Sequence, residues 1–301
     1  MQFITGENEN SPKIAASGNI NSLLDDGDGS SITAIPGDLN SGYSWCYYSL
    51  FKNCKNLTKA PNLPAIDVYT HAYRDMFMLC ISLTTAPELP ATSLASYCYY
   101  NMFYGCMSLT SAPELPAEEM YPYCYSHMFH NCQNLTTAPE LPATSLASYC
   151  YQAMFYRCYA LTTSPELPAM DLKSNCYESM YGYCTSLVNV PDLPAELSQG
   201  SANVYYCYSS MFDGCSSLVK APDIYLKKVV PGAGIWSVMF QNCTKLKSIK
   251  LVNYTGQITA SFGFQNWVNG VGTGGTIYYK GSTTTQGVSS IPVGWAIDQN
   301  W

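Results

Sequence analysis

The segment LTTAPELPATSLASYCY occupies residues 83–99 and recurs without a single change at residues 135–151. Both copies belong to a longer series in which a cysteine follows an aromatic residue by three positions. This aromatic–x–x–Cys signature occurs at Phe51/Cys54, Phe77/Cys80, Phe103/Cys106, Phe129/Cys132, Phe155/Cys158, Tyr181/Cys184, Phe212/Cys215 and Phe240/Cys243. The first six copies are 26 residues apart, and the last two steps are 31 and 28 residues. Eight interchangeable segments predict a solenoid, because a single globular core does not tolerate such copying.

Each repeat contains a proline-rich stretch that limits the length of its strand. In the repeat at residues 83–109, Pro87 and Pro90 cannot donate hydrogen bonds to a neighbouring strand. We therefore expect a short strand at Ser82–Ala86. Strands stacked about 4.8 Å apart would arrange eight repeats as a rod roughly 40 Å long.

A second element follows the prolines. Leu94, Cys98 and Met102 are spaced i, i+4 and i+8, which is typical of one face of a helix. We expect a short helix or 3-10 turn at about residues 93–104. A strand and a short helix within 26 residues predict an α/β repeat fold, a leucine-rich-repeat solenoid of about eight units.

The two ends of the chain lack the signature. Segments of different composition are expected there, because the open apolar ends of a solenoid must be covered. The sequence therefore predicts an N-terminal cap at residues 1–42, a solenoid at residues 43–251 and a β-rich C-terminal cap at residues 252–301. Within the last segment, residues 276–281 have the pattern of a hairpin.

The composition of the 301-residue chain excludes several classes of protein. Charged residues make up 12% and the net charge is -7, whereas nucleic-acid binding needs a basic surface. No apolar run reaches the ~18 residues that a membrane-spanning helix requires. Residues 1–10 have neither the basic nor the apolar segment of a signal peptide. We expect no nucleic-acid partner, no membrane insertion and no visible export signal.

The 14 cysteines occupy two registers of the repeat. Eight belong to the signature, and six more lie eight residues before it: Cys46, Cys98, Cys124, Cys150, Cys176 and Cys207. Ala72 and Ile235 hold that register in the other two repeats, which favours a buried apolar position over a disulfide or a metal ligand. We expect buried free thiols. Disulfides within each repeat are the alternative, and they would leave Cys80 and Cys243 unpaired.

A tyrosine follows the second cysteine register in seven repeats, and Trp236 takes its place in the eighth. A residue next to a buried one is expected to point elsewhere, so the rings should form a column along the rod. Packing between repeats is one interpretation of this column. The other is a platform for sugars or for side chains of a partner. The candidate ligand-binding residues are Tyr73, Tyr99, Tyr125, Tyr151 and Tyr177.

Acidic residues form another column within the proline-rich stretch. It contains Glu88, Glu114, Glu140 and Glu166 and continues with Asp192 and Asp223. Exposed charges at these positions would keep the sheet from pairing with other chains. The alternative is a surface for a basic partner or one bridged by cations, so the four glutamates are further candidate ligand-binding residues.

The possible catalytic and metal sites are incomplete. His127 and His130 lie near Cys124 and Cys132, but the histidines occupy variable registers and the cysteines occupy the apolar ones. The acidic run at residues 25–28 lacks the glycine and the final glutamate of a calcium loop. No phosphate-binding loop and no nucleophile elbow occurs. We expect a non-enzymatic protein without a cofactor or metal.

The repeat resembles a known family. Its pattern, Leu-x-x-Ala-Pro-x-Leu-Pro followed by Met-Phe-x-x-Cys-x-x-Leu, is similar to the BspA-like leucine-rich repeats of Bacteroidetes surface proteins. Cys98 stands where that family has isoleucine, and Met102-Phe103 stand where it has Ala-Phe. Residues 291–295 are similar to the ends of such proteins.

This resemblance implies a function. The chain would be a monomeric adhesion or binding module, extracellular or at the cell surface, that recognises a host or bacterial protein or glycan along the solenoid. Two alternatives stay open. The chain could belong to a phage or another particle that recognises host cells, or it could be a passive structural spacer.

Overall fold

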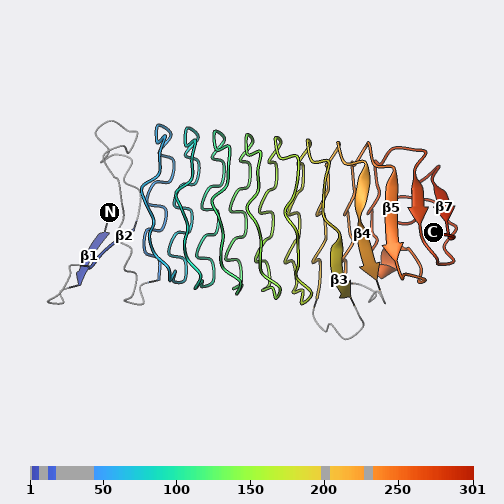
Figure 1. Cartoon of the computed structure of the whole chain (residues 1–301), viewed down its shortest axis with the longest axis horizontal. Helices are drawn as coiled ribbons and strands as arrows, with labels where there is room; N and C mark the ends of the chain where they lie inside the picture. The colour runs from blue at the N-terminus through green and yellow to red at the C-terminus, as the bar shows by residue number, and fades with distance from the viewer. Residues whose placement is uncertain (1, 7–12, 18–43, 198–203, 227–232) are drawn as a thin grey trace.

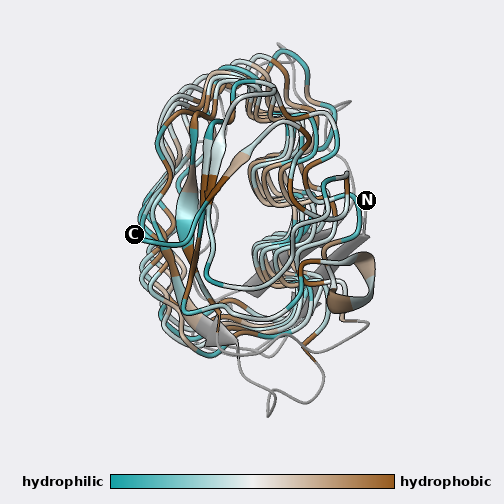
Figure 2. Ribbon diagram, turned by 90° about the vertical axis from the view of Figure 1, so that its right-hand side faces the viewer, coloured by the Kyte–Doolittle hydropathy of each residue, from teal (hydrophilic) through white to brown (hydrophobic). Residues whose placement is uncertain are grey.

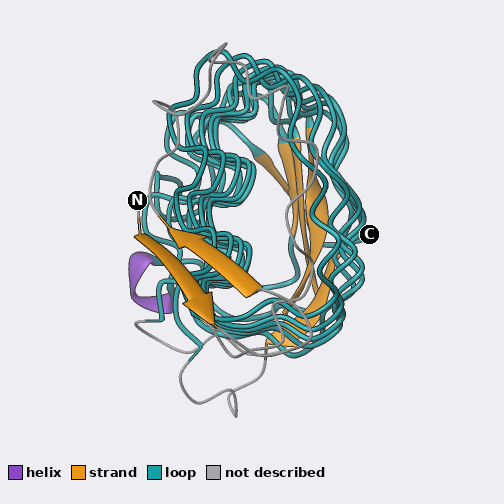
Figure 3. Ribbon diagram, turned by 90° about the vertical axis from the view of Figure 1, so that its left-hand side faces the viewer, coloured by secondary structure: helices purple, strands orange, loops and turns teal. Residues whose placement is uncertain are grey.

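The repeats are successive coils of one solenoid, stacked along its long axis (Figure 1). A computed structural model describes residues 2–6, 13–17, 44–197, 204–226 and 233–301. Seen along the axis, the coils superpose as an oval, and the parallel strands of the C-terminal half lie on one side of it (Figures 2 and 3). The predicted repeat architecture is confirmed. Most of the predicted N-terminal cap, including the acidic run at residues 25–28, lies outside the described residues.

The regular strands lie at the two ends of the described chain. β1 (Gln2–Gly6) and β2 (Lys13–Ser17) form an antiparallel pair at the N-terminal end. A parallel sheet follows chain order from β3 to β7. Its strands are β3 (Leu193–Leu197), β4 (Lys220–Leu226), β5 (Ser248–Val252), β6 (Thr276–Tyr278) and β7 (Ala296–Asp298). A single 3-10 turn, η2 (Ala260–Phe262), is the one helical segment of the described residues.

The parallel sheet continues without interruption into residues 252–301. β6 pairs in parallel with both β5 and β7. The hairpin predicted at residues 276–281 is therefore wrong, because this segment forms another coil of the solenoid. The segment contains β6 and β7, and its role as a β-rich cap stays a prediction.

In the earlier coils the strand shrinks to single parallel bridges. Thr85 bridges to Lys59 of the preceding coil, and no other residue of the predicted strand at Ser82–Ala86 is in a ladder. The prolines that follow have no N–H to donate, so the pairing is interrupted and resumes past them, where Ser93 bridges to Asp67. β4 is longer because Tyr225 replaces the second proline of its repeat.

Two sets of backbone hydrogen bonds build the opposite side of each coil, which we call the turn wall (residues 97–105 and the equivalent residues of other coils). Alternate residues donate to the next coil, as from Tyr99 N to Cys124 O (3.0 Å) and from Asn101 N to Ser126 O (3.1 Å). The residues between them donate three positions back, as from Met102 N to Tyr99 O (3.1 Å). The wall is thus a chain of consecutive turns that is also bonded to its neighbours.

The short helix predicted at residues 93–104 is wrong. An α-helix directs every N–H along its own axis, whereas here every second N–H is used between coils. Every fourth residue of the wall also has a positive φ, including Tyr97 (60°), Asn101 (55°) and Gly105 (72°). A positive φ at the third position is the hallmark of a type II turn and does not occur in a helix.

This backbone buries side chains in consecutive pairs. Cys98 and Tyr99 point inward, as do Met102 and Phe103, and each is at most 1% exposed. The phenylalanine rings stack from coil to coil, with centroids 5.6 Å apart for Phe77 and Phe103. The solenoid interior is therefore filled by columns in which the same or a similar apolar residue recurs from coil to coil.

All fourteen cysteines are buried and none is in a disulfide, as the sequence predicts. In the signature register the thiol donates to the carbonyl of the preceding coil's aromatic residue, as from Cys132 Sγ to Phe103 O (3.1 Å). In the second register the contact is weaker, with Cys98 Sγ 4.0 Å from Cys124 O. Burial raises the pKa of Cys124 to about 12, so these thiols are not reactive nucleophiles.

Replacing the signature thiol should cost more stability than replacing the second one. Cys132→Ala removes a fully buried sulfur and its hydrogen bond, for an expected loss of about 2 kcal/mol. Cys98→Ala introduces an alanine at a register where a neighbouring coil already has one, Ala72, and it should cost about 1 kcal/mol. Urea unfolding of the two variants measures the difference, and equal losses would contradict the role assigned to the Cys132 hydrogen bond.

Gly105→Ala should destabilise the protein more than Gly274→Ala. Both glycines have positive φ, +72° and +73°, so an alanine at either site costs about 1 kcal/mol of backbone strain. A Cβ at Gly105 would also lie 2.7 Å from Cδ2 of Leu79, whereas nothing lies within 4 Å of one at Gly274. We expect a total loss of about 2 kcal/mol at Gly105, measured by thermal or urea unfolding. A smaller loss at Gly105 than at Gly274 would show that the packing of the wall is not as described.

Candidate binding surface

The tyrosine column predicted to contact a ligand lies inside the solenoid. Tyr73, Tyr99, Tyr125, Tyr151 and Tyr177 are each 1% exposed. Their rings stack on one another with centroid distances of 5.6 to 5.9 Å. The expectation of a ligand platform is therefore wrong, and the packing interpretation is confirmed. The error arises because the turn wall buries two consecutive residues, so the neighbour of a buried cysteine is buried as well.

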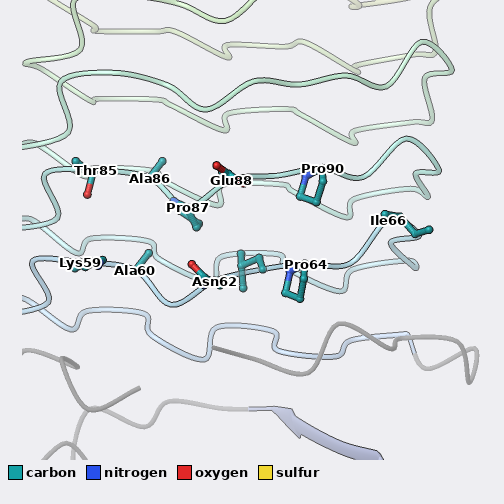
Figure 4. A pocket seen from close by; sticks show the side chains of 11 residues that line it. Lys59, Ala60, Asn62, Pro64, Ile66, Thr85, Ala86, Pro87, Glu88 and Pro90 are labelled. Atoms are coloured by element: carbon teal, nitrogen blue, oxygen red, sulfur yellow. The ribbon is translucent and has the colours of Figure 1, made fainter. Parts of the chain in front are cut away.

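The acidic column lies on the opposite side of the coil and faces solvent. Glu88, Glu114, Glu140 and Glu166 are all exposed. Two shallow grooves follow the proline-rich stretches there, and one of them, with a volume of about 550 Å³, is lined by Asn62, Pro64, Glu88 and Pro90 among others (Figure 4). Whether the glutamates bind a partner stays a prediction.

Farther along this column the carboxylate has another role. Asp223 is 8% exposed and pairs with Lys250 Nζ at 2.9 Å and with Lys220 Nζ at 3.4 Å. Its N–H donates to Asp192 Oδ1 at 2.9 Å. In these coils the acidic register is part of the sheet's ion pairs rather than a free surface.

A second stack of rings lies on the outer side of the turn wall. It consists of Trp45, His71, Tyr97, Tyr123 and Tyr149, which we call the outer aromatic ladder. Their centroids are separated by 3.9, 4.7, 4.5 and 4.4 Å, and their planes are within 10° of parallel. Trp45 is 46% exposed and the other four are half-buried. These rings are accessible, unlike the tyrosines of the inner column.

The backbone of the turn wall positions the outer ladder. Each ladder residue has a positive φ, between 59° and 68°. Each also donates its N–H to the next coil, as from Tyr123 N to Ser148 O (3.2 Å). Sequence analysis missed this ladder, although its signal was present. The residue directly before the second cysteine register is aromatic or histidine in the first five repeats.

A cation lies against the ladder at its N-terminal end. The Arg74 guanidinium is 4.8 Å from the ring centroid of Tyr100, 5.7 Å from Tyr97 and 5.9 Å from Trp45. Desolvation, and secondarily the Arg74 charge, lower the pKa of His71 below its ordinary value. The ladder is therefore neutral at pH 7 and carries one fixed positive charge beside it.

A shorter stack runs parallel to the ladder. His130 lies between Tyr104 and Tyr156, with centroid distances of 4.5 and 4.8 Å. Burial lowers the pKa of His127 to about 4, and burial together with the charges of His127 and Arg157 lowers that of His130 to about 3. Within the described part of the chain, no three His, Cys, Asp or Glu side chains come together as a metal site.

Comparison with protein families shows which family the repeats match. Residues 30–136 and 96–222 match the family described as the BspA type leucine rich repeat region, in six copies. Comparison with curated proteins gives no match. No helix of the described residues is long and apolar enough to cross a membrane.

Acid should destabilise the protein through its buried histidines. The pKa values of His127 and His130 lie below 6.5, so between about pH 6.5 and 4 the unfolded chain binds protons that the folded chain does not. The free energy of unfolding should therefore fall with decreasing pH, by up to about 1.4 kcal/mol per pH unit for each histidine. Urea unfolding across this range measures the slope.

His130→Tyr is the matched control, because tyrosine occupies the same register in the two neighbouring coils. The variant keeps the stack between Tyr104 and Tyr156 and should reduce the slope by about one proton. An unchanged slope would mean that His130 is protonated in the folded protein.

Proposed function

Because this chain belongs to the BspA-type leucine-rich repeat family, we propose that it is a non-enzymatic binding module that recognises a protein or glycan through the outer side of its turn wall. Repeat proteins of this kind are generally binding or surface modules. The further proposal is that this one is an extracellular or cell-surface adhesion module that acts as a monomer on a host or bacterial surface.

The observation that carries the proposal is the outer aromatic ladder. The inner columns recur in every coil because stacking requires them. The outer register, by contrast, holds Asn175 and Gly234 in later coils, and Asn175 N still donates to Tyr205 O of the next coil (2.9 Å) without a ring there. Five accessible rings in succession are thus not demanded by the fold, and exposed aromatic residues beside an arginine are typical of binding surfaces.

The geometry supports a particular mode of contact. Ladder rings cover each other's faces, so their edges and the tyrosine hydroxyls are what a partner meets. Hydroxyls repeated at the coil spacing can each form one weak hydrogen bond to a long partner. Simultaneous weak contacts along a rigid rod multiply into useful affinity.

The two other roles make different demands on the surface. A component of a phage or another particle that recognises host cells would use the same ladder. That alternative differs in where the protein comes from and not in which surface binds. A passive spacer needs no accessible rings, and the outer ladder argues against it.

Binding to an array of host glycans and matrix proteins tests the proposal. The wild type is compared with Tyr97→Ala/Tyr123→Ala, which removes two outer rings, and with Glu88→Gln/Glu114→Gln on the opposite side. Both variants should keep the thermal midpoint within a few degrees, because none of the four residues is fully buried. We expect the ladder variant to lose at least tenfold in affinity and the glutamate variant to bind like the wild type.

Two outcomes would contradict the proposal. Loss of binding in the glutamate variant alone would move the site to the proline-rich side. No binding by the wild type to any member of the array would favour the spacer.

A further inference from the structure

The outer aromatic ladder is interrupted at one coil. Its register continues from Tyr149 to Asn175 and then to Tyr206, so a short amide stands between two rings. A shallow depression of about 470 Å³ lies at this point, lined by Tyr149, Ser174, Asn175, Glu178, Tyr205 and Tyr206. We call it the slot. Tyr205 and Tyr206 are 47% and 45% exposed, so its far wall is accessible.

At the regular spacing of the coils, the slot is as wide as one missing rung. Within the intact ladder, Tyr97 and Tyr149 are two rungs apart, with steps of 4.5 and 4.4 Å through Tyr123. Two rungs bounding an empty one are therefore about 9 Å apart at the usual spacing of stacked chains. Tyr206 does not fold into the gap, because its ring leans over Gly234 of the next coil, where a Cβ would overlap it.

The floor of the slot is polar and held in place. Glu178 Oε2 accepts hydrogen bonds from Asn175 Nδ2 and from Gln152 Nε2, both at 2.8 Å. Gln152 is fixed in turn by Ser126, whose hydroxyl donates to its Oε1 at 3.3 Å. Among the hydrogen bonds of the described residues, none goes to Glu178 Oε1. The carboxylate is thus oriented by neutral donors and keeps an acceptor for a ligand.

We propose that the slot binds one neutral pyranose ring, inserted between Tyr149 and Tyr206 with its hydroxyls directed at Glu178. A ring stacked on a planar aromatic needs about 3.5 Å on each face, because that is the contact distance of carbon atoms. A planar ligand ring would therefore fill about 7 Å between the two tyrosine rings, less than their separation of about 9 Å. A puckered sugar fits this separation better, because its axial hydrogens add thickness to both faces.

The polar groups point to the same class of ligand. Sugar hydroxyls both donate and accept, which matches a carboxylate acceptor beside amide and hydroxyl groups. An acidic sugar would be repelled by Glu178 and by the net charge of -7. This inference rests on the proposed binding function, for which it names a ligand class and a site.

Titration with free sugars tests the inference. Glucose, galactose, mannose and N-acetylglucosamine are titrated by saturation-transfer NMR, with sialic acid as the acidic probe and benzyltrimethylammonium as a cationic one. A single ring in an open site should bind with a Kd of about 1 mM. We expect at least one neutral hexose to bind and sialic acid not to bind.

Asn175→Tyr is the decisive variant because it adds the missing rung. Asn175 has φ 58°, the same conformation in which Tyr149 (62°) already holds a tyrosine, so the variant should fold. It should weaken hexose binding at least tenfold. Asn131→Tyr is the matched control, since the same substitution is made at φ 61° in a register where Tyr183 occurs, outside the slot. It should leave hexose binding unchanged.

Three results would overturn the inference: no hexose binds the wild type, hexose binding survives Asn175→Tyr, or only the ammonium compound binds. None of these decides the proposed function. If the array gives partners that are lost in Tyr97→Ala/Tyr123→Ala but retained in Asn175→Tyr, the turn wall binds and the slot is not the site. A silent array together with hexose binding that Asn175→Tyr abolishes would support the slot and leave the long partner unfound.

Discussion

Hydrogen bonds between coils are the interaction on which the rest of this structure depends. Every second N–H of the turn wall points along the solenoid axis to the next coil, and the others close turns within the coil. A helix cannot share its N–H groups between two coils in this way, because it uses each of them within itself. It requires a positive φ at every fourth residue, a conformation that costs about 1 to 2 kcal/mol for an L-residue. Asparagine and glycine are frequent at these positions because the cost is lowest for them.

The same backbone decides which side chains can vary. Consecutive residues point inward in pairs, so cysteine, tyrosine, methionine and phenylalanine each fill a column in which one coil's side chain contacts its copy in the next. A mismatch in such a column leaves a void between two rigid coils. The pairs of residues that point outward contact only their own column and water. Their side chains can therefore change type from coil to coil. Residues that hold the coils together and residues that can vary therefore lie on alternate faces of one wall.

The sequence was sufficient for the architecture and insufficient for the local backbone. The repeat, the solenoid and the buried thiols can be predicted by comparing equivalent positions of the repeats, since Ala72 and Ile235 show that the cysteine register is apolar. The helix prediction failed because a spacing of four over a dozen residues resembles the 3.6-residue period of a helix. Cys98, Met102 and Cys106 keep a strict spacing of four, which a helix could not maintain on one face. Without that distinction, Tyr99 was placed outside and the ring at Tyr97 went unnoticed.

The interruption at Asn175 follows from this separation of roles. In the inner columns a residue without a ring would leave the neighbouring rings unsupported, and in the described coils the Tyr99 register never loses its aromatic side chain. In the outer register the coil stacks through its backbone, so a missing ring exposes the faces of its neighbours at little cost to the fold. Ring faces are otherwise hidden throughout the ladder. The break in the ladder exposes ring faces between two coils, and the polar chain from Ser126 through Gln152 to Glu178 ends there.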